Sequence, residues 1–367
     1  MRVHPSQLVP GCILTKEVMG RTKRPIIPKN TVIHHTHIHV LHNFLISSVD
    51  VAAKLSDGSR YMPLEKMEDP ESPAISPETP PSAEEPLSFQ EQYLEAVQQY
   101  KQWYANWRSG APIDIQQIRT IMVPLLEGAV ESRREVFLLH HYSSEQEYPY
   151  HHSVATAVIS TFLAAKMGHT YGEWIQIGLA GLLSDAGMAK IDNRILNKEE
   201  SLDEQEFEEV KKHAAYSYRL VESIPSLSIS AKLAILQHHE RLDGSGYPLG
   251  LNQDKLHPFG QIIALSDMYH AMTSERVYRD KHSPFKVLEE ILQEQFGRYD
   301  HKVIQVLAKE LASYSTGSKV KLSNGQEAEV MFVETNHPAR PMLRTKENGE
   351  IVHLKERLDL HIEEIID

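Results

Sequence analysis

Apolar positions in the middle of the chain recur at the three- and four-residue spacing that is typical of amphipathic helices. Residues 88–140 show this spacing in Tyr93, Tyr100 and Trp103, and Gly110–Pro112 interrupts it before it resumes. An aromatic stripe of this kind more often packs in a core or a dimer contact than it binds a ligand. We therefore predict a helical connecting segment here, which carries a signal between neighbouring modules.

Three apolar runs predict the helices of a core over residues 141–313. The first helix is expected from His151 to Met167 and the second from Ile177 to Leu183, while the third leads directly into a pair of histidines. The buried faces of the first and third helices are expected to comprise Val154, Ala155, Val158, Ile159, Phe162, Leu163, Ile229, Leu233 and Leu236. These long periodic segments predict a mainly α fold.

Shorter patterns at the two ends of the chain predict β structure. Residues 1–61 alternate short apolar runs with turn signals, which favours a small β-rich or α+β accessory module. Residues 314–367 contain strand-like runs joined by Ser323–Gly325, and another run follows the Asn348–Gly349 turn. A small β module is therefore expected at the C-terminal end, flanking the helical core.

Residues 62–87 differ in composition from everything around them. Seven prolines lie between Met62 and Pro86, together with seven acidic residues and one lysine, which gives this segment a charge of −6 (one minus seven). Such a segment cannot bury enough apolar surface to fold, and proline stiffens it into extended structure. We predict a linker between the N-terminal module and the rest of the chain.

Overall composition limits the class of protein and its partners. With 367 residues and 41% hydrophobic residues the chain is long enough for several domains and a sizeable core. The net charge of −12 argues against binding to nucleic-acid polymers or to anionic membranes. The single cysteine, Cys12, and the lack of an apolar leader or a long apolar run indicate a cytoplasmic protein. The sequence leaves a homodimer open.

Histidine is abundant, with 21 residues in the chain, but its clusters differ in meaning. Five histidines of the N-terminal module stand close together without carboxylate partners: His34, His35, His37, His39 and His42. We expect them to serve packing or the surface, with adventitious metal binding as the minor alternative. No chemistry is visible in that module.

The most informative stretch is His238–Pro248, where two adjacent histidines are followed by a glycine-rich loop. Neighbouring positions on a helix point about 100° apart, so His238 and His239 serve one site only at a frayed helix end or across two neighbouring ions. Gly244 and Gly246 allow the backbone to approach an anion closely. A chance histidine pair next to an ordinary loop is the alternative interpretation of this stretch taken alone.

The whole string from His238 to Pro248 resembles the signature of the HD-GYP family of metal-dependent phosphohydrolases. The resemblance extends from about His152 to Tyr299 and includes Ser184–Asp185 and Ser266–Asp267. It implies an all-helical HD-type core with bound metal ions. It also implies hydrolysis of a cyclic dinucleotide, usually cyclic di-GMP, and the N-terminal and C-terminal modules are similar to those that accompany this core.

The resemblance also assigns roles to particular residues. Asp185 is the catalytic, bridging carboxylate of a metal pair, which holds a deprotonated water in line with phosphorus. The metal ligands implied are His152, Asp185, His213, His238, His239 and Asp267. The substrate-binding residues implied are Asp243, Gly244, Gly246, Tyr247, Arg276 and Arg279, although an ordinary helix-end ion pair is an alternative for either arginine. Mixed imidazole and carboxylate donors favour two iron or manganese ions, with zinc or nickel as alternatives.

At four positions the chain departs from the family pattern. Ser184 replaces the histidine of the His-Asp pair, and Met188 replaces a lysine that contacts phosphate; Lys190 lies two residues further on. Tyr148 replaces a glutamate that accompanies a third metal ion, and His270 replaces an aspartate. Serine is a weak ligand, so one of the two metal sites should be weakened and a third ion is not expected.

Three functions are therefore compatible with the sequence. The first is a working cyclic di-GMP phosphodiesterase of reduced activity. The second is a degenerate relative that binds cyclic di-GMP, or a protein partner through its loop and accessory modules, without turnover. The third is a phosphohydrolase that acts on another nucleotide by the same chemistry.

Overall fold

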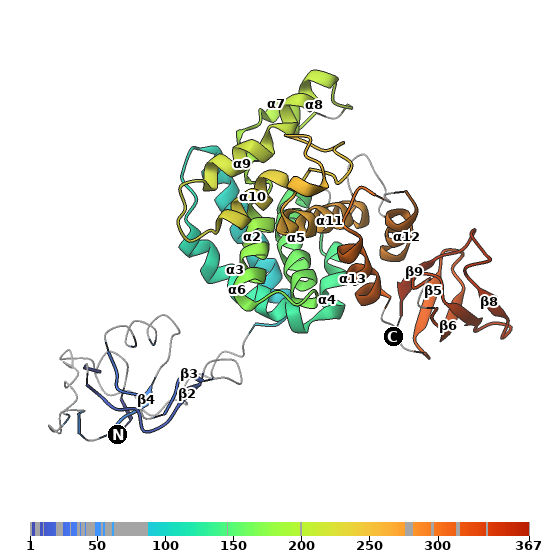
Figure 1. Cartoon of the computed structure of the whole chain (residues 1–367). Helices are drawn as coiled ribbons and strands as arrows, with labels where there is room; N and C mark the ends of the chain where they lie inside the picture. Colours follow the sequence, from blue (N-terminus) through green and yellow to red (C-terminus); the bar gives the residue numbers. More distant parts are fainter. Residues whose placement is uncertain are drawn as a thin grey trace, which may run out of the picture. The chain divides into compact units, whose positions relative to one another are not determined.

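The computed structural model describes most of residues 87–366, apart from 145, 199, 276–281, 295–296, 313–315 and 335–336. Before residue 87 it describes 2–3, 8–9, 11–19, 25–29, 31–34, 37, 41, 48–52, 54–55 and 61. The chain forms two compact units, Met1–Ala83 and Glu84–Asp367, and each is considered by itself (Figure 1). Arg276 and Arg279 lie outside the described residues, as does nearly all of the predicted linker.

The first unit contains short antiparallel strands. Strand β1 (Arg2–Val3) pairs with β4 (Val49–Asp50), and β2 (Val18–Met19) pairs with β3 (Pro25–Ile27). Buried side chains including Cys12, Leu14, Ile33, Leu41 and Val51 form its core. Of the five clustered histidines the structure describes His34 and His37, and no metal-binding grouping occurs among the described residues of this unit.

The second unit is built around helix α5 (Tyr148–Lys166), in which every residue from His151 to Ala164 is buried. Helices α2 (Phe89–Arg108), α3 (Ile115–Glu131), α4 (Arg133–Leu138), α6 (Tyr171–Leu183) and α11 (Pro258–Thr273) pack around it (Figure 1). The prediction of a single buried face for this helix is therefore wrong. Neighbours cover α5 on all sides, and its small residues such as Ala155 and Ala157 permit close approach.

The predicted connecting segment is part of this core. Its aromatic stripe on α2 is buried at Tyr93, Tyr100 and Trp103, and α2 also contacts the short helix η3 (Ala186–Lys190), which follows Asp185. Ser88 and Glu91 form a capping box that starts α2. The packing therefore makes α2 a wall of the core, so the aromatic stripe serves packing.

Helix α6 is longer than predicted, because Thr170 and Glu173 cap it well before the apolar run begins. The remaining helices are α7 (Asn193–Leu196), α8 (Glu204–Lys211), α9 (His213–Val221), α10 (Ile229–Gln237), α12 (Pro284–Glu294) and α13 (His301–Leu311), with single turns η2 (Leu139–His141) and η4 (Gln253–Lys255). The face predicted to be buried on α10 is wrong: Ile229 is exposed, and Leu233 and Leu236 are only half-buried. The helix buries Ala231, Ala234 and Ile235 instead, because its opposite face packs on the core.

The chain ends in a five-stranded antiparallel sheet with the order β8-β7-β6-β5-β9. Its strands are β5 (Lys319–Leu322), β6 (Glu327–Phe332), β7 (Met342–Thr345), β8 (Ile351–His353) and β9 (Ile362–Ile365). Gly325 turns between β5 and β6 with a φ of 84°, as the hairpin signal predicted. The sheet packs on the core through β9 and α12, where Glu289 and Arg340 form a largely buried ion pair of 2.6 Å.

The predicted fold class is confirmed: the protein is mainly α-helical, with a small antiparallel sheet in its C-terminal region. Strands β7 and β9 had no clear signal in the sequence, and pairing with β6 and β5 defines them. Within the described residues, no helix combines the length and the apolar character needed to cross a membrane.

Candidate metal centre and cavity

The two adjacent histidines stand where α10 stops. Helix α10 ends at Gln237, and His238 is its C-cap. Because the chain leaves the helix at this point, His238 and His239 turn toward the same place, with ring centroids 4.0 Å apart. The structure thus adopts the first of the two arrangements considered above, a pair of imidazoles at a helix end.

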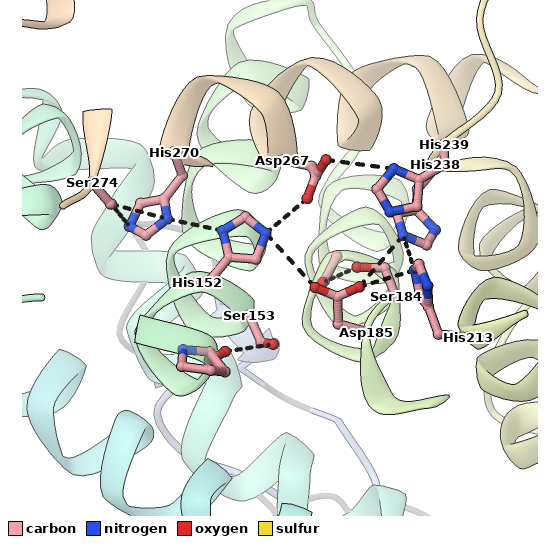
Figure 2. Close-up of polar contacts among 12 residues, drawn as sticks. His152, Ser153, Ser184, Asp185, His213, His238, His239, Asp267, His270 and Ser274 are labelled. Carbon is pink, nitrogen blue, oxygen red and sulfur yellow. Dashed lines mark hydrogen bonds and ion pairs between the residues drawn. The ribbon is translucent and has the colours of Figure 1, made fainter. Parts of the chain in front are cut away.

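Four side chains from three segments of the chain converge here to form the first grouping: Asp185, His213, His238 and His239 (Figure 2). Asp185 follows α6, and His213 begins α9. The Nε2 atoms of His213 and His238 lie 3.3 Å and 3.6 Å from Oδ1 of Asp185, and 3.3 Å from each other. All candidate ligand atoms of the grouping lie within 4.8 Å of one another.

Hydrogen bonds fix which nitrogen of each ring faces the grouping. The Nδ1 atoms of His213 and His238 lie 2.7 Å from the carbonyl oxygens of Val210 and Ile235. A carbonyl only accepts, so Nδ1 carries the proton and the neutral ring presents a lone pair at Nε2. The lone pairs then face Oδ1 of Asp185, a buried atom without a hydrogen bond. A cation placed between the two Nε2 atoms and Oδ1 of Asp185 would be coordinated by all three, so this donor set fits a divalent metal ion.

The charges in the grouping agree with this geometry. Burial raises the pKa of Asp185, but the facing rings of His213 and His238 outweigh it and hold the pKa well below its ordinary value. Burial lowers the pKa of His213, whereas Asp185 raises it, and the net direction is upward. Burial and the neighbouring His238 lower the pKa of His239. At neutral pH the grouping therefore offers an ionised carboxylate and an unprotonated His239.

The second grouping consists of His152, Asp185 and Asp267, so Asp185 belongs to both. Nε2 of His152 lies 2.7 Å from Oδ1 of Asp267 and 3.7 Å from Oδ2 of Asp185. Burial raises the pKa of Asp267, but His152 and then His239 lower it far more. Ser184 adds no donor, because its hydroxyl donates to the carbonyl of Gly181 at 2.8 Å. This grouping has three side chains where the first has four.

His270 contacts His152, a member of the second grouping, on the side of the ring that faces away from the other members. Its Nδ1 lies 3.0 Å from Nδ1 of His152, on the side of that ring opposite Asp267 (Figure 2). Ser274 contacts His270 in turn, and Tyr148 stacks on His152 with ring centroids 5.1 Å apart. His270 therefore orients His152 and lies outside both groupings, so it does not replace the histidine missing at Ser184.

The other candidate replacements are also engaged elsewhere. His151 contacts the hydroxyl of Tyr93 on α2 at 3.1 Å, and burial lowers its pKa. Lys190 donates to the carbonyl of Trp107 at 3.1 Å, so it points away from the groupings. Neither the missing imidazole nor the missing ammonium has a substitute at these positions.

Both groupings open into a cavity of about 520 Å³. It is lined by Tyr148, His152, Asp185, Met188, His239, Arg241, Tyr247, Asp267, Met268, Ala271, Met272, Glu290, Arg298 and Tyr299. The size suits a nucleotide-sized ligand, and Met268, Ala271 and Met272 supply an apolar wall from one face of α11. Met188 is part of the lining, so a longer cationic side chain at this position would enter the cavity.

Among the loop residues expected to bind substrate, Tyr247 lines the cavity, whereas Asp243, Gly244 and Gly246 do not. Oδ1 of Asp243 accepts hydrogen bonds from the backbone and hydroxyl of Ser245. A Cβ on Gly246 would lie 2.4 Å from Cα of Glu240, so this glycine lets the loop fold back on itself. These residues shape the loop and thereby place Tyr247.

Sequence reasoning missed Glu240, Arg241 and Arg298. The buried carboxylate of Glu240 accepts from the backbone of Leu249 and Leu251 at 2.6 Å and 2.9 Å, which ties the loop to the histidine pair. Glu240 directly follows those histidines in the sequence, so its position in the motif was a signal that could have identified it. Arg298 lies 59 residues (298 minus 239) beyond His239, and no motif residue marks it.

Comparisons with known proteins agree with this geometry. A family model described as HD domain matches residues 140–303. A cyclic di-GMP phosphodiesterase from Pseudomonas aeruginosa is 29% identical over 61% of this chain and 54% of its own length. Another from Thermotoga maritima is 37% identical over 39% of this chain and 38% of its own length. A 3'3'-cGAMP-specific phosphodiesterase from Vibrio cholerae is 35% identical over 37% of this chain and 29% of its own length.

The HD-domain match covers both groupings and the loop that ends in Tyr247. Residues 140–303 therefore form an HD domain of the HD-GYP type. The HD-domain match begins after α4 and ends in α13, so α2, α3, α4 and the C-terminal sheet lie outside it. The chain spans about half or less of the length of these relatives. HD domains bind divalent metal ions, and the first grouping provides a donor set of this kind.

Proposed function

We propose that this HD-GYP protein hydrolyses cyclic di-GMP to a linear dinucleotide, with a turnover that is low for its family. The observation that carries the proposal is Asp185, which is shared by two groupings of metal-binding side chains at the wall of one cavity. The names of the relatives support a cyclic dinucleotide as the substrate class.

Different residues of the chain would have different roles in this hydrolysis. Divalent ions held by His213, His238 and His239 on one side, and by His152 and Asp267 on the other, would lower the pKa of a water near the scissile phosphate. Asp185 orients both sets through its two oxygens. Burial raises the pKa of Tyr247, so its hydroxyl stays protonated and can donate to a phosphate oxygen.

Two positions argue for slow turnover. Ser184 leaves the second grouping with three side chains, so an ion there would be held more weakly than in the first grouping. Met188 lines the cavity without a charge where the family has lysine. Loss of one electrostatic donor typically costs on the order of 10²–10³ in rate, which leaves a slow enzyme.

A second candidate, a cyclic di-GMP-binding protein without turnover, is favoured by the same weakened grouping. If an ion binds only at Asp185, His213, His238 and His239, the protein holds a ligand beside one metal and lacks the pair that supports hydrolysis. The relatives named for 3'3'-cGAMP favour testing that nucleotide as an alternative substrate.

The deciding experiment combines metal analysis with a product assay. Protein purified without a histidine tag would be analysed for iron, manganese, zinc and nickel, and then incubated with cyclic di-GMP or 3'3'-cGAMP and added Mn²⁺ or Fe²⁺. We expect slow appearance of the linear dinucleotide in the chromatogram. Bound metal and bound nucleotide without any product would instead establish the second candidate.

A further inference from the structure

A buried serine of helix α9 reaches the turn that carries Asp185. Asp185 stands between Ser184, the C-cap of α6, and the short helix η3, so a brief irregular stretch of backbone positions its side chain. Ser217 lies four residues after His213, so the two side chains share one face of α9. The bonds that Ser217 makes to this turn therefore link the backbone of one metal-binding residue to the helix of another.

The hydroxyl of Ser217 forms a hydrogen bond on each side of Asp185. It donates to the carbonyl of Ser184 at 2.5 Å and accepts from the backbone N–H of Gly187 at 2.7 Å. Ser217 is fully buried, so water does not compete for either bond. A hydroxyl can donate one hydrogen bond and accept others, and here it does both across the same short turn.

Close packing also holds this turn against α9. A Cβ added to Gly187 would lie 2.1 Å from the carbonyl oxygen of His213 and 2.5 Å from the backbone nitrogen of Ser217, so the turn approaches α9 as closely as a glycine permits. The carbonyl of Asp185 accepts from the backbone of Met188 at 2.9 Å, which is a bond within the turn itself. The helix that supplies His213 therefore also holds the backbone of Asp185.

We propose that Ser217 is a positioning residue of the metal centre, which fixes where Asp185 stands relative to His213. The proposal rests on the proposed function only in that the first grouping binds a divalent ion. Oδ1 of Asp185 and Nε2 of His213 lie 3.3 Å apart and face each other (Figure 2), so an ion between them needs both atoms in place. A ligand whose backbone is held in advance loses less freedom when the ion binds.

Removal of the hydroxyl should weaken metal binding without removing a ligand. Partners outside the ligand shell typically contribute 10- to 100-fold to metal affinity. Ser217 bonds to backbone on either side of a ligand rather than to the ligand's own side chain. We therefore expect Ser217→Ala to raise the dissociation constant for Mn²⁺ about 10-fold, the lower end of that range. The carbonyl and the N–H left without partners should also lower the Tm of the metal-free protein.

Ser283 offers a matched control in the same compact unit. Its buried hydroxyl also bridges two backbone groups, because it donates to the carbonyl of Ile362 at 2.8 Å and accepts from the N–H of Lys286 at 3.2 Å. Ser283 belongs to neither grouping and is not part of the cavity lining. Ser283→Ala should therefore lower Tm in EDTA, as Ser217→Ala does, and keep the wild-type affinity for Mn²⁺.

The test is calorimetric titration of Mn²⁺ into metal-stripped wild type, Ser217→Ala, Ser217→Cys and Ser283→Ala, with Tm measured in EDTA. A thiol at position 217 donates and accepts only weakly, so Ser217→Cys should bind Mn²⁺ with intermediate affinity, and it carries the comparison if Ser217→Ala does not fold. Turnover of cyclic di-GMP would be followed over a range of Mn²⁺ concentrations. We expect Ser217→Ala to need more Mn²⁺ than wild type for its half-maximal rate.

The outcomes separate the role of Ser217 from the proposed activity. Wild-type affinity for Mn²⁺ in Ser217→Ala, with a lower Tm in EDTA, would show a purely structural hydroxyl and overturn the proposal. An equal loss of affinity in Ser283→Ala would overturn it too, because any loss of stability would then be sufficient. Weaker Mn²⁺ binding in Ser217→Ala alone, without turnover in any variant, would sink the hydrolysis and support the proposal. A wild type that binds no Mn²⁺ would overturn both.

Discussion

The two groupings should differ in how firmly they hold metal, and single substitutions can expose this difference. Asp185, His213, His238 and His239 supply four donors, whereas His152, Asp185 and Asp267 supply three. His238→Asn removes a donor from the first set, and Asp267→Asn removes one from the second. We expect the first variant to lose the tightly bound ion and the second to keep it.

The magnitude follows from linkage between binding and folding. An ion at 100 times its dissociation constant stabilises the folded protein by about 2.7 kcal/mol. At about 2 °C per kcal/mol, which is typical for a large domain, this raises Tm by roughly 5 °C. Loss of a direct ligand should weaken binding at least about 100-fold, the upper limit for outer-shell partners. The stabilisation then falls to about 0.4 kcal/mol, a shift of less than about 1 °C.

The assay is the difference in Tm between metal-loaded and EDTA-treated protein, because His238 is fully buried and its replacement destabilises the metal-free fold as well. His151→Asn is the matched control, because His151 is also buried, contacts the hydroxyl of Tyr93, and belongs to neither grouping. It should lower Tm and keep the metal-induced shift. The reasoning is refuted if Asp267→Asn abolishes the shift as completely as His238→Asn does, or if wild type shows no shift.

Three further predictions concern charge and the loop. Combining Ser184→His with Met188→Lys should raise the rate of linear-product formation, and a double variant that binds two ions yet stays as slow as wild type would contradict this. Glu240→Gln should weaken two charge-assisted hydrogen bonds, cost about 1–3 kcal/mol, and speed hydrogen exchange at Leu249 and Leu251; unchanged exchange would exclude the anchoring role. Burial lowers the pKa of His213, but Asp185 raises it, and the net pKa lies above the ordinary value of histidine. The stabilisation that protonated His213 gives the metal-free protein is therefore present at low pH and is lost as pH rises through that pKa. Metal needs the neutral ring, so the metal-induced Tm shift should grow from pH 6 to 8, and a shift that shrinks would contradict the assignment.

Local patterns in the sequence predicted much of this architecture. The periodicity predicted α2, α3, α5, α6 and α10 but not α7 to α9 or α11 to α13. The string from His238 to Pro248, with its companions, indicated which histidines and carboxylates come together. Contacts between distant segments were not predictable in the same way. The burial of α5 on all sides, the hydrogen bond between His270 and His152, and the place of Arg298 in the cavity each depend on packing between elements far apart in the chain. A single sequence carries no periodic or motif signal for such contacts.

The departures from the family pattern are not spread evenly over the site. Tyr148 and His270 both contact His152, Ser184 precedes the shared Asp185, and Met188 lines the cavity on that side. By contrast, the residues of the first grouping keep their identity, and the rings of His213 and His238 keep hydrogen bonds to backbone carbonyls. If the site had simply lost its function, substitutions in either grouping would have been equally tolerated. The intact first grouping is therefore where we expect a metal ion to bind most firmly, and its loss should affect folding, ligand binding or slow hydrolysis.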